Sequence, residues 1–161
     1  MTSPRAHRVL DADSMRELGE RLGSVLSAGD VVLLIGGLGA GKTTFTQGLG
    51  KGLGVQGQIT SPTYIVARVH DALADGPDLV HVDAYRLEDD LDLETVDLDA
   101  SADEAVTVVE WGRGRAEGLS DQRLEIEFSF VDPDEGEEDP RHVTFIPVGE
   151  GWHARLQEAG L

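Results

Sequence analysis

The apolar positions of this chain fall into short runs that are separated by polar and glycine-rich segments. Residues 31–35, Val-Val-Leu-Leu-Ile, form a continuous apolar run, which predicts a buried strand of a parallel sheet. Two further apolar runs, at 79–82 and 105–109, also predict strands. The first of these ends at Asp83 and the second at Glu110, so acidic side chains are expected at the ends of two buried strands.

Other segments alternate between apolar and polar residues, as strands with one buried face do. Residues 124–131 and 142–148 predict an antiparallel hairpin, with an exposed acidic turn between them at 132–140. Residues 64–69 alternate more weakly and predict one more strand, and a turn is expected at 71–78.

Helical patterns occur in three places. Residues 14–27 predict an amphipathic helix, with Ser14 and Glu17 at the spacing of a capping box. Its apolar face would be formed by Met15, Leu18, Leu22, Val25 and Leu26. Residues 43–49 predict a short helix, and residues 152–159 predict a short terminal one. The glycines expected to end the helix at 43–49 are Gly50, Gly52, Gly54 and Gly57.

The strand at 31–35 and the helix at 43–49 enclose a phosphate-binding loop. Residues 36–43, Gly-Gly-Leu-Gly-Ala-Gly-Lys-Thr, match the pattern G-x-x-x-x-G-K-[ST] in full. Glycines let backbone N–H groups surround a phosphate, and the following helix directs its positive end at the same group. Lys42 adds a cation for the β- and γ-phosphates, and the Thr43 hydroxyl can bind Mg²⁺. With the correct element on each side, the loop predicts nucleotide binding rather than a simple turn.

The composition is that of one globular domain. The chain has 161 residues, is 40% hydrophobic, and contains no internal repeat or linker, so residues 1–161 are expected to form a single domain. There is no apolar run of about 18 residues, which a membrane span needs, and no signal-peptide core follows the first residues. Cysteine is absent, which excludes disulfides and thiolate metal sites. Together these features favour a cytoplasmic location.

The chain is also strongly acidic, because 31 Asp and Glu residues against 13 Lys and Arg residues give a formal net charge of -18. This charge repels the phosphate backbone of a nucleic acid, so any dealing with nucleic acid is expected to occur through a partner. Solubility alone explains most of the excess acid. The phosphate loop is then a local positive spot, where Mg²⁺ becomes more important for holding a triphosphate.

A phosphate-loop ATPase needs a second acidic group at a strand end, either to hold Mg²⁺ or to polarise the attacking water. Asp83 and Glu110 are the two candidates, because ligands of α/β sheets gather at the carboxyl ends of the strands. Either one alone could be an ordinary strand-end acid. Two of them in a chain with a phosphate loop favour a role in the site.

Several neighbouring residues allow more than one interpretation. Residues 60–64, Thr-Ser-Pro-Thr-Tyr, lie where nucleotide-sensing segments usually occur, but their spacing alone favours a plain turn. Arg86 could neutralise phosphate charge or form a structural salt bridge. Trp111 could pack over the nucleotide, although a core position is the simpler expectation, and His81 is expected to be a buried, hydrogen-bonded strand residue. No Asn-Lys-x-Asp segment for guanine is present, which favours adenine.

Four segments together resemble one family, the small bacterial ATPase TsaE, which supports threonylcarbamoyladenosine formation in tRNA. They are the phosphate loop continued through Phe45 (36–45), Ser-Pro-Thr-Tyr (61–64), His-Val-Asp-Ala-Tyr-Arg-Leu (81–87) and Glu-Trp (110–111). Their order and spacing match over roughly residues 10 to 150. A phosphate loop alone is generic, whereas the set of four is specific.

The resemblance implies an α/β fold, namely a single P-loop NTPase-like domain with a mixed, mostly parallel central sheet and flanking helices. It implies a Mg²⁺-dependent ATP hydrolase that is weak alone and works with the TsaB and TsaD proteins. ATP hydrolysis would reset their complex between rounds of tRNA modification. The chain would meet tRNA only indirectly, through that complex, and would not contact a membrane.

The resemblance also implies roles for individual residues. The ATP phosphates would be bound by Gly39, Ala40, Gly41, Lys42, Thr43 and Thr44. Mg²⁺ would be held by Thr43 and Glu110. Asp83 would be important for hydrolysis, with Lys42 and Glu110 as the other catalytic residues. Residues 61–64 would act as a switch region, and Trp111 would shape the site beside Glu110.

The chain departs from the family pattern in a few places. Gly37 stands where the family usually has Asp, and residues 88–104 lack the family's usual glycine. The acidic turn at 132–140 is an elaboration of this chain. The adenine contacts are left open, with the stretch Leu10 to Asp13 and Arg141 as candidates.

Two other functions remain as alternatives. A metabolite kinase would need an acceptor pocket and usually an arginine-rich lid, and after the loop only Arg113 and Arg115 form a close pair of arginines. A nucleotide-responsive module that does not hydrolyse ATP is the second alternative. It is disfavoured because four residues needed for turnover are intact: Lys42, Thr43, Asp83 and Glu110.

Overall fold

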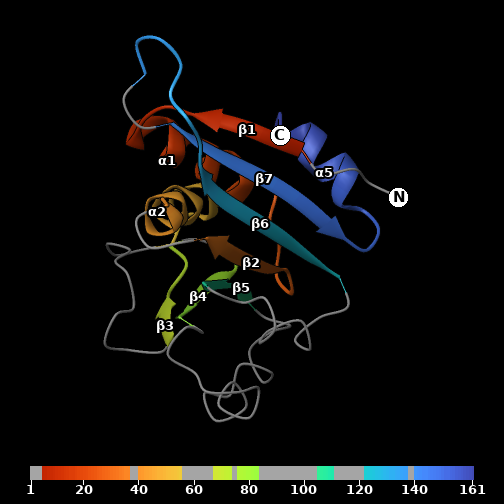
Figure 1. Ribbon diagram of the computed structural model, residues 1–161. Coiled ribbons are helices and arrows are strands. Elements are labelled where there is room, and N and C mark those ends of the chain that lie inside the picture. The colour runs from red at the N-terminus through yellow and green to blue at the C-terminus, as the bar shows by residue number, and fades with distance from the viewer. Residues whose placement is uncertain are drawn as a thin grey trace.

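The computed structural model describes residues 5–36, 40–55, 67–73, 76–83, 105–110, 122–137 and 140–161. Within them, seven strands form one sheet and three helices pack against it (Figure 1). The strands are β1 (Arg5–Val9), β2 (Val31–Gly36), β3 (Ala67–His70), β4 (Asp78–Asp83), β5 (Ala105–Glu110), β6 (Arg123–Phe130) and β7 (Arg141–Val148). The helices are α1 (Ala12–Gly23), α2 (Lys42–Leu53) and α5 (Trp152–Glu158).

The sheet has a parallel centre and antiparallel edges. Its strand order is β1-β7-β6-β2-β5-β4-β3. Strand β2 runs parallel to β5 and β6, and β5 runs parallel to β4. Strands β7, β1 and β3 join antiparallel to their neighbours. The expected mixed sheet is confirmed, as is the hairpin β6–β7. Strand β1 was not predicted, because its sequence Arg-Ala-His-Arg-Val does not alternate between polar and apolar residues, although its burial does.

The hydrophobic core lies between the sheet and the three helices. It combines alternate residues of the central strands with the inner faces of the helices, as the two periodicities require. The strand side includes Val32, Leu34, Leu79, Val106, Val108, Leu124, Ile126, Phe128 and Phe145. The helix side includes Met15, Leu18, Leu22, Phe45, Leu49, Trp152 and Leu156. The intervening residues of β2, Val31 and Leu33, are buried on the opposite face, so the continuous apolar run was correctly interpreted as a doubly buried strand.

Two helix boundaries differ from the expectation. Helix α1 begins at Ala12 because the Asp11 side chain caps it, accepting a hydrogen bond from the Ser14 amide at 2.7 Å. The expected capping role of Ser14 is therefore wrong, and the helix ends at Gly23 rather than at residue 27. Both Asp and Ser are good capping residues, so the sequence alone does not decide between them.

Helix α2 is longer than expected and continues to Leu53, so it does not stop at Gly50 or Gly52. The residue that ends it is Gly54, whose φ of 80° lies in the left-handed region that favours glycine. Gly48 and Gly52 remain helical because they face the backbone of α1, where no side chain would fit. These glycines allow close helix packing rather than terminating the helix.

The short helix α5 is confirmed and is attached to the segment between α1 and β2. The Arg155 guanidinium bonds the Val25 carbonyl at 2.8 Å and also pairs with the Asp30 carboxylate. Its plane lies over the Trp152 ring, 4.3 Å from the centroid. None of the helices in the described ranges is long and apolar enough to cross a membrane.

Candidate functional site

The phosphate loop joins the end of β2 to the start of α2, at the centre of the sheet. Of its residues, Gly36 and 40–43 are described, whereas Gly39, one of the predicted phosphate ligands, lies outside the described residues with 37 and 38. Gly41 has a φ of 106°, a conformation that favours glycine. A Cβ there would also lie 2.7 Å from the Met15 side chain. The loop geometry thus favours glycine at this position, whereas the Met15 methyl, at the end of a flexible side chain, could move aside.

Helix α2 presents an open N-terminus to the loop. Its N-cap is Gly41, so no side chain caps the first amides, and these are the groups that bind phosphate in such loops. Lys42 is the first helical residue and is 5% exposed. Its Nζ donates a hydrogen bond to the Gly36 carbonyl at 2.8 Å, which ties the two ends of the loop together. Thr43 is half-buried in the same turn.

The two predicted acids lie at the same edge of the sheet as the loop. Asp83 ends β4 and is the register partner of Glu110, which ends β5, while Glu110 is also paired with Leu34 of β2. Parallel strands bring their carboxyl ends to one edge, so the backbone positions expected from the sequence are confirmed. Glu110 is 5% exposed; the side chain of Asp83 lies outside what the structure describes.

His81 contacts Glu110 directly. Its Nε2 lies 2.8 Å from Oε2 of Glu110, and the imidazole is fully buried. Since a carboxylate accepts hydrogen bonds, the Nε2–H of His81 is the donor. The expectation of a buried, hydrogen-bonded histidine is therefore confirmed, and its partner is a predicted metal ligand.

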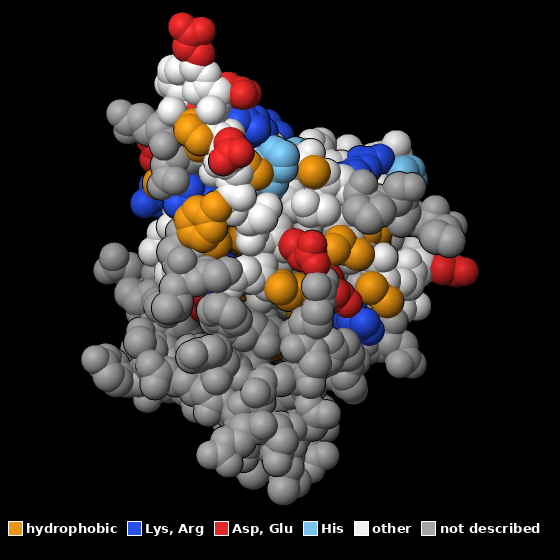
Figure 2. Space-filling model, in the orientation of Figure 1, with side chains coloured by type: hydrophobic (Ala, Val, Ile, Leu, Met, Phe, Trp, Pro, Cys, Tyr) orange, Lys and Arg blue, Asp and Glu red, His pale blue; other side chains and the backbone are white. Residues whose placement is uncertain are grey.

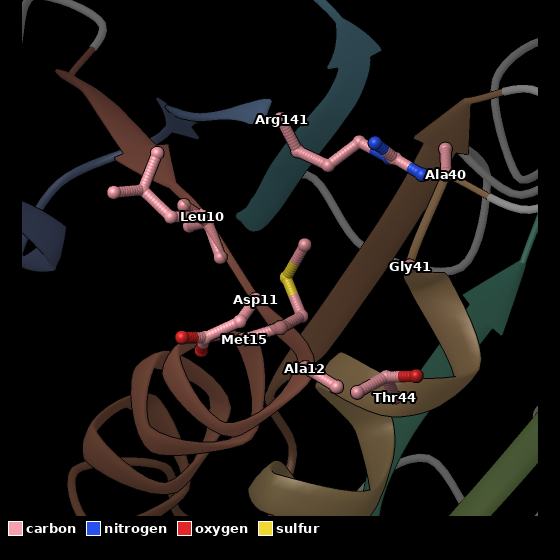
Figure 3. Close-up of a pocket in the computed structure, with 9 residues that line it drawn as sticks. Leu10, Asp11, Ala12, Met15, Ala40, Gly41, Thr44 and Arg141 are labelled. Atoms are coloured by element: carbon pink, nitrogen blue, oxygen red, sulfur yellow. The ribbon is translucent and has the colours of Figure 1, made fainter. Parts of the chain in front are cut away.

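A cavity of about 240 Å³ lies beside the loop (Figure 3). It is lined by Val9, Leu10, Asp11, Ala12, Met15, Ala40, Gly41, Thr44 and Arg141. The lining joins three parts of the chain, since β1 and α1 form one wall, the loop and α2 form the next, and Arg141 of β7 extends toward Ala40. The candidates for adenine contact were the stretch Leu10 to Asp13 and Arg141. All of them except Asp13 line this one cavity, next to the phosphate loop.

Two of the residues that line the cavity are charged, Asp11 and Arg141. The hydrogen bond from the Ser14 amide lowers the pKa of the Asp11 carboxyl, which stays ionised at neutral pH. The Arg141 guanidinium lies 4.2 Å from the centroid of the Phe130 ring and donates to the Pro140 carbonyl at 3.4 Å. Sequence reasoning missed Met15 as a lining residue, because its place in the helical pattern indicated only a core position.

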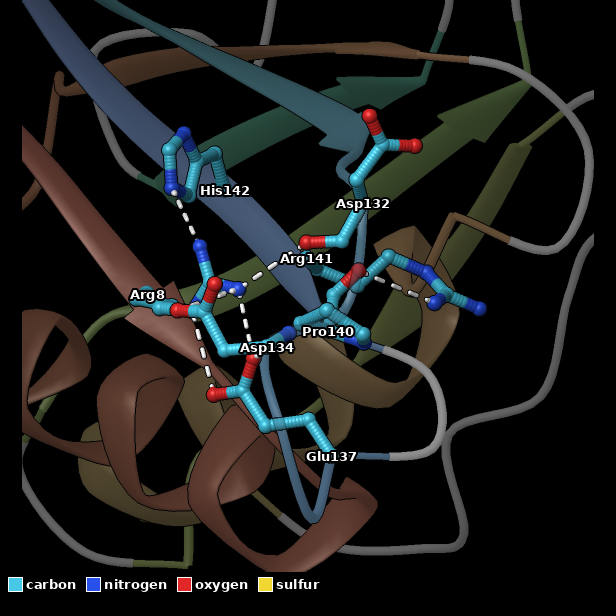
Figure 4. A network of polar contacts seen from close by, with 7 residues as sticks. All are labelled: Arg8, Asp132, Asp134, Glu137, Pro140, Arg141 and His142. Atoms are coloured by element: carbon cyan, nitrogen blue, oxygen red, sulfur yellow. Dashed lines mark hydrogen bonds and ion pairs between the residues drawn. The ribbon is translucent and has the colours of Figure 1, made fainter.

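The acidic turn projects from the molecule next to Arg141 and is fixed by Arg8 (Figures 2 and 4). Arg8 donates to both carboxylate oxygens of Glu137, from Nε at 3.1 Å and from Nη2 at 2.5 Å, and Nη2 also bonds the Asp132 carbonyl at 3.1 Å. The Arg8 hydrogen bond lowers the pKa of Glu137 to about 2. The predicted exposed acidic turn is confirmed over residues 132–136, whereas Glu137 is only partly exposed and Pro140 is buried.

The remaining predicted site residues lie outside the described part of the chain. They are Gly37, the switch candidate at 60–64, Arg86, the segment 88–104, Trp111, Arg113 and Arg115. Their proposed roles stay predictions.

Comparisons with known proteins agree with this arrangement. A "tRNA threonylcarbamoyladenosine biosynthesis protein TsaE" of Streptomyces coelicolor is 56% identical over 139 residues, which cover 86% of this chain and 93% of the relative. A protein of the same name in Bacillus subtilis is 33% identical over 157 residues, or 94% and 90% of the two chains. The crystal structure of Bacillus subtilis YdiB superposes with a TM-score of 0.78 at 28% identity and covers 99% of this chain and 96% of that one.

The parallel strand ends, the loop closed by a buried lysine and the open helix that follows define a phosphate-loop α/β domain. The family model described as threonylcarbamoyl adenosine biosynthesis protein TsaE matches residues 9–138. The chain belongs to the TsaE family.

Proposed function

We propose that this chain is a Mg²⁺-dependent ATP hydrolase that supports threonylcarbamoyladenosine formation in tRNA. The observation that carries the proposal is the position of the 240 Å³ cavity, which shares Ala40, Gly41 and Thr44 with the phosphate loop. A nucleotide can therefore place its phosphates on the loop and its base in the cavity.

The phosphate end of the site is suited to a polyanion. The first amides of α2 have no side-chain cap, and the positive end of the helix dipole points at the loop. Gly39, Ala40, Gly41, Lys42, Thr43 and Thr44 are proposed as the phosphate ligands. Lys42 would exchange its bond to the Gly36 carbonyl for the β- and γ-phosphates, so a bond inside the protein is replaced rather than lost.

The donors available for Mg²⁺ are a hydroxyl and a carboxylate, Thr43 and Glu110, which are the hard oxygen ligands that this ion prefers. Glu110 uses Oε2 for His81, and Oε1 takes no part in that bond. The donor chemistry therefore fits the ion, which would supply charge neutralisation at the transferred phosphoryl group. Asp83, beside Glu110 in the sheet, is proposed to position the attacking water.

The base end of the site is apolar with two charged groups. Leu10, Ala12 and Met15 can contact the faces of a flat ring, while Arg141 and the ionised Asp11 are available for its edges or for the ribose. Pockets that hold whole drug-sized ligands have volumes of about 300–1,000 Å³. A cavity of about 240 Å³ therefore suits the nucleoside alone, with the phosphates outside it on the loop.

The partners proposed for the chain are the TsaB and TsaD proteins. ATP hydrolysis would reset their complex between rounds of modification, and tRNA would be handled by them. A net charge of -18 supports this division of roles, because the chain itself is repelled by a nucleic-acid backbone.

The test is multi-turnover threonylcarbamoyladenosine formation by purified TsaB and TsaD with their substrates, with and without this chain and Mg²⁺-ATP. Lys42→Ala should abolish the contribution of the chain, while Lys51→Ala, on the same helix with a side chain that is 75% exposed, should retain it. Full multi-turnover activity without the chain would contradict the proposal. A further outcome is that a variant that binds ATP but does not hydrolyse it supports multi-turnover modification as well as the parent does. That result would identify the chain as a nucleotide-responsive module rather than an ATP hydrolase.

A further inference from the structure

We propose that His81 is the positioning residue for Glu110: its Nε2–H holds one carboxylate oxygen so that the other is presented to the metal. The inference rests on the proposed function, because it takes Glu110 as a Mg²⁺ ligand. It assigns a task to a buried polar residue that no other step of the proposed reaction uses.

The sheet fixes where His81 and Glu110 stand. His81 of β4 is paired with Val108 of β5, and Glu110 follows Val108 by two residues on the same face of the sheet. Leu79 and Val108 both belong to the core under the helices, so His81 and Glu110 face the side that carries α2 and the loop. The donor therefore approaches Glu110 from within the core, below the strand end.

The hydrogen bond between His81 and Glu110 is buried, and His81 approaches Glu110 from the core side. His81 is fully buried, its Nε2 lies 2.8 Å from Oε2, and Glu110 is 5% exposed. Burying a carboxylate is costly unless it is hydrogen-bonded or bound to a cation. His81 satisfies Oε2 from the core side, which leaves Oε1 as the oxygen available to a ligand outside it.

The chemistry of His81 is that of a supporting group rather than a second ligand. Among the described residues, His81 Nδ1 has no hydrogen-bond partner and is buried, so the ring makes its polar contact through Nε2 alone. In its strand the neighbours are Leu79, Val80 and Val82, and an aliphatic residue at position 81 would fit that pattern. A histidine there is explained by the need of Glu110 for a donor. Groups that orient metal ligands in this way typically change metal affinity about 10–100-fold when they are removed.

The test measures Mg²⁺ affinity directly. Binding of a non-hydrolysable ATP analogue is titrated at a series of Mg²⁺ concentrations, which gives the Mg²⁺ concentration at half-saturation for each variant. His81→Leu and His81→Asn should raise it at least about tenfold, because leucine has no donor and the asparagine amide is too short to reach Oε2. His81→Gln, whose amide can reach that oxygen, should stay within about threefold of the parent.

Controls separate this role from a merely structural one. Thr107→Val changes a buried residue of β5 whose hydroxyl has no partner within the described residues, and it should leave the Mg²⁺ half-saturation unchanged. Melting in metal-free buffer shows which variants fold. A purely structural His81 would lower the melting temperature of all three variants without moving the Mg²⁺ half-saturation of the folded protein, which would overturn the proposal. If His81→Leu does not fold, the comparison of His81→Gln with His81→Asn remains. Equal Mg²⁺ half-saturation concentrations for these two variants would also overturn the proposal.

Glu110→Gln distinguishes failure of this inference from failure of the proposed function. If Glu110→Gln leaves the Mg²⁺ half-saturation unchanged, Glu110 is not a metal ligand, and the inference fails together with that part of the proposed function. If Glu110→Gln raises it and His81→Leu does not, the metal role stands and the inference alone is wrong.

Discussion

A Cβ atom built on Gly48 of α2 would lie 1.9 Å from the carbonyl oxygen of Arg16 in α1. The two helices therefore meet through their backbones, and the same close approach recurs along the contact at Gly19, Gly23 and Gly52. Helix α1 carries one wall of the cavity, and α2 carries the phosphate loop. The contact thus fixes the proposed base site relative to the proposed phosphate site.

Gly48→Ala tests this contact. Alanine normally stabilises a helix interior by about 1 kcal/mol relative to glycine. Here the added carbon would overlap backbone, which no rotamer change can relieve, and overpacking of this kind costs about 1–3 kcal/mol or more. We expect a net loss of at least about 1 kcal/mol in the free energy of unfolding, measured by urea denaturation.

Gly76→Ala is the matched control, since its Cβ would lie 3.4 Å from the Leu53 carbonyl oxygen, an ordinary contact. It should change stability by less than about 1 kcal/mol, in the stabilising direction. A Gly48→Ala protein as stable as the parent would contradict the close helix contact.

These glycines also show where sequence reasoning stops. Within its own segment, a glycine at position 48 or 52 indicates a weak or ending helix. Its actual role depends on a backbone about 30 residues earlier in the chain, which a local pattern does not contain. The capping error at Ser14 arose because Asp11 and Ser14 are both good capping residues, and the local sequence does not decide between them.

The predictions that succeeded rest on local chemistry or on general rules of sheets. The phosphate loop has a complete motif between two recognisable elements, and the carboxyl ends of parallel strands always meet at one edge, which predicts that Asp83 and Glu110 lie together. The cavity joins Leu10, Ala40 and Arg141 from three separate segments. Its residues could be named as candidates, but their meeting in one cavity follows only from the packing of β1, α1 and β7.

Filling the cavity should separate base binding from phosphate binding. Ala12 is exposed at the start of α1 and lines the cavity, so Ala12→Trp should occupy the proposed base site while leaving the loop unchanged. We expect ATP affinity to fall at least about tenfold, which is about 1.4 kcal/mol. Affinity for inorganic triphosphate should stay within about threefold of the parent. Both are measured by titration calorimetry.

Ala154→Trp provides the control, because Ala154 is an exposed residue in the first turn of α5 and does not line the cavity. It should bind ATP and triphosphate as the parent does. If Ala12→Trp weakened both ligands equally, the cavity would be part of the phosphate site rather than the base site.

The attachment of α5 depends on Arg155, which contacts Val25, Asp30 and Trp152. Arg155→Met keeps an apolar stem but removes the donors, and it leaves a mostly buried Asp30 carboxylate without its cation. We expect a loss of about 1–3 kcal/mol in the free energy of unfolding. Relative to the parent, amide hydrogen exchange should accelerate more in α5 than in β6. His153→Ala, on the exposed side of the same helix, should change neither the stability nor the exchange rates. Unchanged exchange in α5 would mean that the apolar contacts of Trp152 and Leu156 alone hold the helix.

The pairing of Arg8 with Glu137 predicts a dependence of stability on pH. The hydrogen bond from Arg8 lowers the pKa of Glu137 to about 2 in the folded protein, from an ordinary value of 4.5. A carboxyl whose pKa is lowered by folding binds fewer protons in the folded state, so its contribution is fully present above that ordinary value. The contribution is then lost as the pH falls from about 4.5 toward about 2.

Glu137→Gln should therefore have a lower urea midpoint than the parent at pH 7, and the difference between the two should shrink as the pH falls through this range. Glu135→Gln, an exposed acid of the same turn, should match the parent at pH 7. Because the turn leads directly into Arg141, Glu137→Gln should also weaken ATP binding at pH 7 if the turn holds that residue at the cavity. A difference in midpoint that stayed constant from pH 7 to pH 2.5 would show that Glu137 acts through packing or neutral hydrogen bonds instead of its charge.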